Sequence, residues 1–131
     1  MKNQTLNKNP LIFVVDDDPI YHKLLKYNLN IDNYNNIKSF NSGEDCIQNI
    51  KLAPDVVILD YEMDGMNGIQ TLQKIKKFNK DIKVILFSAQ EKMNIVSKSL
   101  KFGASYYIQK NEHAYNKIKS FMNILFNDNQ M

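Results

Sequence analysis

Carboxylate, hydroxyl and ammonium side chains directly follow four apolar runs of this sequence. Asp16 and Asp17 follow the first run, Asp60 follows a later one, and Ser88 and Lys110 follow two more. Several carboxylates close together repel one another and need a cation, and hard oxygen ligands suit Mg²⁺. A carboxylate nucleophile, a divalent ion, a lysine that neutralises phosphoryl oxygens and a hydroxyl donor together suit phosphoryl transfer. Asp60 is the candidate nucleophile.

Acyl transfer and zinc hydrolysis lack their characteristic side chains at these positions. We expect His22 and His113 on helix surfaces or at helix starts, away from the acidic residues, and assign neither as a ligand or phosphoacceptor. Cys46 is the only cysteine, which excludes an internal disulfide and a cysteine metal cage. It is expected to be a small buried apolar side chain.

The elements that must position these residues alternate along the chain. Short apolar or alternating runs predict five strands, and helical spacing or helix-start signals after each predict five helices. Ser42 is a predicted helix N-cap and Gly103 a predicted helix end. After Pro19, four apolar residues lie near helical spacing: Ile20, Leu24, Leu25 and Tyr27. This order predicts an α/β fold with a parallel sheet between two helical layers, whose strands all end at one edge. The predicted strands are 11–15, 36–40, 55–59, 82–87 and 104–109.

Length and charge point to one ordinary domain. The chain has 131 residues and a net charge of +3 that comes from lysine, with no arginine. Without arginine or a nucleic-acid-binding signature, we expect no nucleic acid partner. No run reaches the roughly 18 to 20 apolar residues of a membrane span, so we expect a cytoplasmic protein that does not enter a membrane. We expect flexible tails at 1–9 and 128–131 around a domain at 10–127.

Four motifs in register carry a family resemblance. "FVVDDDP", "VVILDYEMDGMNG", "ILFSA" and "GASYYIQK" stand in an order that resembles the receiver domain of two-component response regulators, of the chemotaxis-regulator type. The resemblance extends from about residue 11 to 126. It implies a flavodoxin-like, doubly wound (βα)5 three-layer sandwich with the strand order 2-1-3-4-5.

The resemblance implies an acceptor and a metal site. Asp60 matches the phosphoacceptor, and Asp16 with Asp17 matches the acidic pair. The implied cofactor is Mg²⁺, with Mn²⁺ as an acceptable substitute. Its ligands would be Asp17, Asp60, Asp16 mainly through water, and the main-chain carbonyl of Glu62, while Asp18 would stay outside.

The resemblance also implies switch residues. Ser88 matches the hydroxyl that turns toward the phosphoryl group, Lys110 the lysine that pairs with it, and Tyr107 the aromatic that rotates inward. Glu62 and Gln90, each two residues after a matched position, flank the path of an attacking water and should tune dephosphorylation.

Two positions depart from the family pattern. Met63-Asp64 replaces the usual Met-Pro, and Lys110-Asn111 replaces the usual Lys-Pro. A cis peptide before a residue other than proline costs about 2.5 to 4 kcal/mol. The Lys110–Asn111 bond is therefore either trans or a strained cis bond, and the aim of the lysine is open.

The implied function is that of a phosphorylation switch and not an enzyme. A sensor histidine kinase or histidine phosphotransfer protein would donate to Asp60, and an unknown protein target would read the result. A homodimer through the surface of the fourth helix, fifth strand and fifth helix is left open. No output domain follows residue 126, which fits a single-domain regulator or a piece of a longer one, and the chain ends favour the former.

Two alternatives remain at this point. One is a degenerate receiver that serves as a phosphorylation-independent interaction module, supported only by the two lost prolines. The other is a Mg²⁺ phosphatase of the haloacid dehalogenase type, which "DYEMDG" echoes superficially. That family places its nucleophile after the first strand, whereas Asp60 follows the third.

Overall fold

Five parallel strands form one sheet in the order β2-β1-β3-β4-β5, as the resemblance implied. The structure is a computed structural model that describes residues 9–89 and 92–126. The strands are β1 (Ile12–Val15), β2 (Ile37–Phe40), β3 (Val56–Leu59), β4 (Lys83–Ser88) and β5 (Tyr106–Gln109). The helices are α1 (Pro19–Ile31), α2 (Gly43–Gln48), α3 (Gly68–Phe78), α4 (Met93–Lys101) and α5 (Ala114–Phe126), with a short 3-10 turn, η1 (Ile50–Leu52). The expected tails lie outside the described residues, apart from residue 9.

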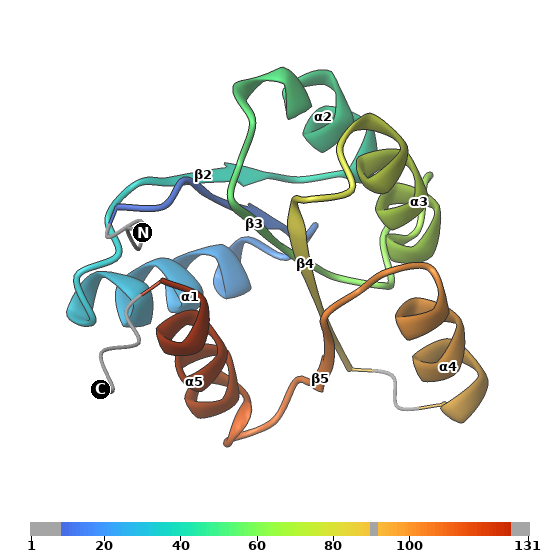
Figure 1. The fold of residues 1–131 in the computed structure, drawn as a ribbon. Coiled ribbons are helices and arrows are strands. Elements are labelled where there is room, and N and C mark those ends of the chain that lie inside the picture. The colour runs from blue at the N-terminus through green and yellow to red at the C-terminus, as the bar shows by residue number, and fades with distance from the viewer. Residues whose placement is uncertain (1–8, 90–91, 127–131) are drawn as a thin grey trace, which may run out of the picture.

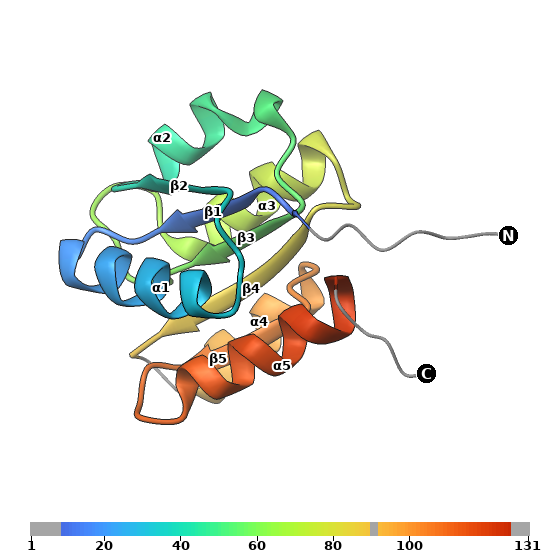
Figure 2. The same cartoon turned by 90° about the vertical axis from the view of Figure 1, so that its left-hand side faces the viewer.

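Helices cover both faces of the sheet and make the predicted three layers. Helices α1 and α5 lie on one face, and α2, α3 and α4 lie on the other (Figures 1 and 2). None of the helices in the described part of the chain is long and apolar enough to span a bilayer.

The central strands are buried along their whole length. All four residues of β1 and all four of β3 are buried. Successive side chains point to opposite faces, so Ile12 and Val14 join the core under α1 and α5, whereas Phe13 and Val15 join the core under α2 and α3. Cys46 is buried in the second core, as predicted. Two-sided packing holds the strand ends rigidly in place.

Helix α1 buries only one of the four apolar residues that its sequence places near helical spacing. Leu25 and Leu29 face the core, whereas Ile20, Leu24 and Tyr27 are 64%, 50% and 67% exposed. Helical spacing alone marks an apolar face without stating which face meets the sheet. The exposed side chains leave an apolar stripe on the outside of α1.

Local signals fix the helix ends. Ser42 accepts a hydrogen bond from the Asp45 N–H and caps α2, as predicted. Gly103 follows α4 with a φ of +108°, which glycine adopts without strain.

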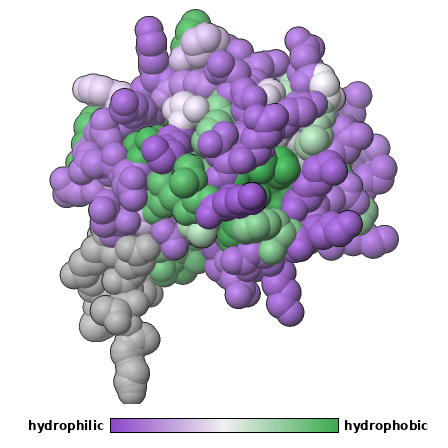
Figure 3. Space-filling model, turned by 90° about the horizontal axis from the view of Figure 1, so that it is seen from above, coloured by the Kyte–Doolittle hydropathy of each residue, from purple (hydrophilic) through white to green (hydrophobic). Residues whose placement is uncertain are grey.

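The surface seen from the α2 side is mostly hydrophilic, with an apolar patch near its middle (Figure 3). The outer surface on this side of the sheet is therefore largely polar.

Candidate functional site

Strand pairing brings the predicted site residues to one edge of the sheet. Val15 pairs with Leu59, so Asp16 and Asp60 leave the sheet side by side. The Asp60 N–H donates to the Val15 carbonyl at 2.9 Å. On the other side of β3, β4 pairs with β5, and the Lys110 N–H donates to the Ser88 carbonyl at 2.8 Å. The strand pairing therefore fixes the Cα positions of the four site residues, which are Asp16, Asp60, Ser88 and Lys110.

Three carboxylates converge at this edge. Asp16, Asp17 and Asp60 each offer an oxygen, and these oxygens lie within 4.8 Å of one another. Asp16 and Asp60 are only 2% and 5% exposed, whereas Asp17 is exposed. Buried like charges at this spacing need a cation, and a set of carboxylate oxygens that opens to solvent at Asp17 fits Mg²⁺, which retains several waters.

Glu62 lies at the same site. The Glu62 N–H donates a long hydrogen bond of 3.4 Å to Asp60 Oδ1. Glu62 also lines a surface hollow together with Asp17 and Asp64. The loop that follows Asp60 thus runs past the acidic cluster, where a main-chain carbonyl can join carboxylate ligands.

Lys110 bridges the two buried carboxylates. Its Nζ lies 2.7 Å from Asp16 Oδ2 and 3.5 Å from Asp60 Oδ2, and its side chain is only 7% exposed. The bond between Lys110 and Asn111 is trans, which answers the question left by the missing proline. Asn111 also accepts a hydrogen bond from the His113 N–H at 2.9 Å, just before α5. The lysine therefore reaches the site from a trans peptide.

Burial and the neighbouring charges shift the pKa values of Asp60 and Lys110. Burial, and secondarily the Asp16 charge, raises the pKa of Asp60 to about 6, although Lys110 and the Glu62 N–H act in the opposite direction. Burial lowers the pKa of Lys110, but hydrogen bonding to Asp16 and the charge of Asp60 raise it overall. Without a divalent cation, one lysine does not fully compensate the paired carboxylates.

Ser88 and Tyr107 lie together beside this cluster. Ser88 is fully buried at the end of β4. Burial raises the pKa of Tyr107, and hydrogen bonding with the Ser88 side chain acts in the opposite direction. Tyr107 packs against the core under α2 and α3, whereas Tyr106 packs edge-on against Phe121 of α5. The two tyrosines therefore face opposite sides of β5.

The turn after β1 is stabilised by its own side chains. Asp16 Oδ1 accepts from the Asp18 N–H at 2.9 Å, and Asp18 Oδ1 accepts from the Ile20 N–H at 3.0 Å, which caps α1. His22 Nε2 lies 2.5 Å from the Asp16 carbonyl oxygen, so this nitrogen donates. The expectation that His22 lies away from the acidic edge is wrong, because the first turns of α1 fold back over the end of β1.

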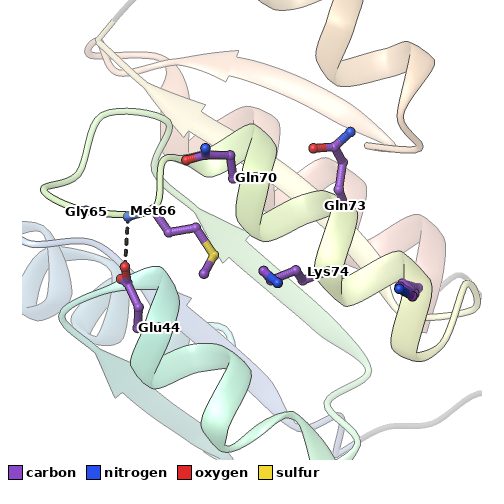
Figure 4. A pocket seen from close by; sticks show the side chains of 7 residues that line it. Glu44, Gly65, Met66, Gln70, Gln73 and Lys74 are labelled. Atoms are coloured by element: carbon purple, nitrogen blue, oxygen red, sulfur yellow. Dashed lines mark hydrogen bonds between the residues drawn. The ribbon is translucent and has the colours of Figure 1, made fainter.

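The loop between β3 and α3 is held from α2. Glu44 Oε2 accepts from the Met66 N–H at 2.9 Å (Figure 4). Gly65 has a φ of +78°, and a Cβ there would lie 2.7 Å from Glu44 Oε2. A Cβ on Gly68 would lie 2.6 Å from the Asp60 carbonyl oxygen. The hollow drawn in Figure 4 is lined by α2 and α3 side chains and by this loop, and contains none of the three clustered aspartates.

Sequence reasoning missed several neighbours of the site. Tyr21 faces Lys110, and Glu44 holds the loop after Asp60, yet no motif marks either, because each contacts a residue distant in sequence. Phe87 stands inside the motif "ILFSA", but the motif gave this ring no role at the site. Gln90 lies outside the described residues, so its predicted effect on dephosphorylation stays a prediction. Glu62 is described and its side chain is exposed, but its effect on dephosphorylation likewise stays a prediction.

The fold and the site together define an α/β domain with three clustered carboxylates and a buried lysine at one edge of its parallel sheet. The family model described as the response regulator receiver domain matches residues 12–121. The chain therefore belongs to the family of response regulator receiver domains, and its role is that of a receiver in a two-component phosphorelay. Neither alternative from the sequence is favoured by these relatives.

Three relatives illustrate the family. The chain is 35% identical to the chemotaxis protein CheY of Treponema pallidum over 102 residues, which cover 76% of this chain and 71% of the relative. It is 36% identical to a protein-glutamate methylesterase/protein-glutamine glutaminase of Clostridium acetobutylicum over 108 residues, 79% of this chain but only 31% of that protein. The structure of a CheX-CheY-BeF3-Mg complex from Borrelia burgdorferi superimposes with a TM-score of 0.79 at 29% identity, covering 88% of this chain and 90% of that one.

Proposed function

We propose that this domain, at residues 10–127, accepts a phosphoryl group on Asp60 from a sensor histidine kinase or histidine phosphotransfer protein. The observation that supports this most directly is the buried Asp60 carboxylate, 3.5 Å from Lys110 Nζ and clustered with Asp16 and Asp17. Mg²⁺, or Mn²⁺ in its place, would be held by Asp16, Asp17, Asp60 and the Glu62 main-chain carbonyl. Bound there, the ion would neutralise charge on the phosphoryl oxygens.

The chemistry is a displacement at phosphorus. An Asp60 carboxylate oxygen forms the new P–O bond, while the bond from phosphorus to the donor nitrogen breaks and the imidazole leaves with that electron pair. Lys110 pairs with a phosphoryl oxygen, and the Ser88 hydroxyl donates to another. Rigid two-sided packing of β3 keeps the nucleophile in line, which supplies part of the rate through positioning.

The phosphorylated site then changes a surface that a protein target reads. Ser88 turns toward the phosphoryl group and Tyr107 follows it inward. The proposed surface is formed by α4, β5 and α5, where Tyr106 and Ile124 expose apolar area. The same surface would serve a homodimer, and exposed apolar side chains such as Leu24 on α1 also suit protein partners. No nucleic acid or membrane contact is proposed, and the location is cytoplasmic.

The chemistry is limited to the domain's own acceptor. Glu62 and Gln90 tune how fast water removes the phosphoryl group, and no external substrate is turned over. The relative named as a methylesterase matches this chain over only 31% of that relative's own length. Methylesterase activity is therefore not proposed for this chain.

The test is the intact mass of the protein after incubation with Mg²⁺ and acetyl phosphate. Wild type is expected to gain one phosphoryl group, and Asp60→Asn and an EDTA-treated sample are expected to gain none. Asp64→Asn, which changes an exposed carboxylate in the same loop, is the matched control and should label like wild type. Labelling of Asp60→Asn, or absence of labelling in Mg²⁺-bound wild type, would contradict the proposal.

A further inference from the structure

An aromatic side chain from α1 covers the ammonium of Lys110. The Tyr21 ring centroid lies 3.9 Å from Lys110 Nζ. Cations within about 6 Å of a ring centroid are attracted to the ring face, and the attraction is strongest where water is excluded. Lys110 is only 7% exposed, so the ring stands where water would otherwise solvate the charge.

Phe87 fixes the orientation of that ring. The centroids of Tyr21 and Phe87 are 5.8 Å apart and their planes are inclined by 83°, an edge-to-face arrangement. Phe87 is itself buried in β4, and its centroid lies 5.4 Å from Lys110 Nζ. Tyr21 is therefore held against a rigid strand and presents its face to the lysine.

The ring and the two carboxylates together determine where the ammonium can sit. Asp16 Oδ2 and Asp60 Oδ2 draw Nζ toward the acidic cluster, while Tyr21 closes another side. A flexible lysine side chain loses considerable rotamer freedom when it is fixed in this way. An aromatic face that holds it before reaction lowers the ordering cost left for the reaction itself.

We infer that Tyr21 is a positioning residue, whose ring face holds the Lys110 ammonium where it can meet the phosphoryl group on Asp60. The inference deepens the proposed function and rests on it for its kinetic consequence. The geometry between Tyr21 and Lys110 can nevertheless be tested without phosphorylation.

The kinetic experiment compares labelling rates with acetyl phosphate at saturating Mg²⁺. Tyr21→Leu removes the ring and should slow labelling about 3- to 30-fold. Tyr21→Phe keeps the ring face and should stay within about twofold of wild type. Tyr27→Leu, which removes an exposed tyrosine from the same helix, is the matched control and should label like wild type.

A shape-matched variant separates the ring's charge distribution from its packing. Pentafluorophenylalanine at position 21 fills nearly the same space with a reversed quadrupole, and should slow labelling as Tyr21→Leu does. It also covers the case in which Tyr21→Leu fails to fold. Labelling as fast as Tyr21→Phe, or an unchanged or higher rate in folded Tyr21→Leu, would overturn the inference.

A second readout does not depend on the acceptor chemistry. In NMR spectra of the unphosphorylated protein, the ε-methylene protons of Lys110 should show an upfield ring-current shift in wild type and Tyr21→Phe. Most of the shift should be lost in Tyr21→Leu, where only the more distant Phe87 ring remains near Lys110. If wild type shows this shift but never labels, the proposed function fails while the contact stands; if the shift is absent, the positioning role fails.

Discussion

Asp60 combines two demands that oppose each other at the scale of a single residue. A nucleophile must be ionised, yet burial beside Asp16 raises its pKa to about 6. Lys110, 3.5 Å away, offsets part of this effect. A bound divalent cation would offset the remainder, because an adjacent positive charge favours the ionised carboxylate. Under the proposed function, metal binding would therefore favour the ionised form of the Asp60 nucleophile.

The raised pKa of Asp60 predicts a pH dependence of stability. The Asp60 carboxyl ordinarily has a pKa of 3.8, so between pH 3.8 and about 6 it holds a proton in the folded protein but not in the unfolded chain. The protonated carboxyl avoids the cost of a buried charge, and the free energy of unfolding therefore falls as the pH rises through about 6. The loss amounts to at most about 3 kcal/mol. In urea unfolding with EDTA, Asp60→Asn should gain stability relative to wild type between pH 5 and pH 7.5. An equal difference at both pH values would contradict the assignment.

The Glu62 side chain is exposed beside the acceptor, where it can affect an approaching water. Substitution Glu62→Ala should change the rate of phosphoryl loss several-fold in either direction, because general-base or steric effects on water act at this step. Metal affinity should stay nearly unchanged, since the proposed ligand is the main-chain carbonyl. The decay of labelled protein after acetyl phosphate removal measures the rate, with Asp64→Ala as the control. An unchanged decay rate would count against this role.

The loop between β3 and α3 matters at the scale of elements, because it links the acceptor to the proposed carbonyl ligand. Glu44 of α2 holds it at Met66, and Gly68 allows α3 to start against the Asp60 main chain. The loop conformation therefore depends on two helices as well as on its own residues.

Gly68→Ala should disturb this arrangement. A Cβ at 2.6 Å from the Asp60 carbonyl oxygen forces the backbone to move, at a cost of about 1 to 3 kcal/mol. Mg²⁺ affinity measured by calorimetry should fall together with stability. Gly103→Ala is the control. Gly103 has a φ of +108°, so an alanine there is also destabilising, but the residue precedes β5 at the end of the strand away from the acidic cluster. It should leave Mg²⁺ affinity unchanged, and equal losses of affinity in both variants would argue against a local effect.

At the scale of the whole molecule, the acidic site draws on β1, β3 and β5 at once. Metal binding at their shared edge should therefore stabilise the entire fold, because the unfolded chain does not assemble the cluster. Mg²⁺ at about 100 times its Kd should add about 2.7 kcal/mol and raise Tm on the order of 10 °C. Asp17→Asn should lose most of this increase, measured by thermal unfolding with Mg²⁺ and with EDTA. A full increase in that variant would remove Asp17 from the ligand set.

The sequence by itself determined the order of elements and the residues at their ends. Asp16, Asp60, Ser88 and Lys110 were predicted to meet because parallel strands with helical crossovers end at one edge, and the resemblance implied the strand order. These are properties of local periodicity and chain direction, which neighbouring residues encode.

Only the tertiary structure decided how distant elements face one another at the site. It determined that α1 exposes Leu24 and buries Leu25, that His22 reaches the Asp16 carbonyl, and that the Tyr21 ring covers Lys110. Each of these contacts depends on the rotation of a helix about its own axis as it packs on the sheet. Helical spacing leaves that rotation open when more than one side of the helix is apolar, and packing of the complete core selects it.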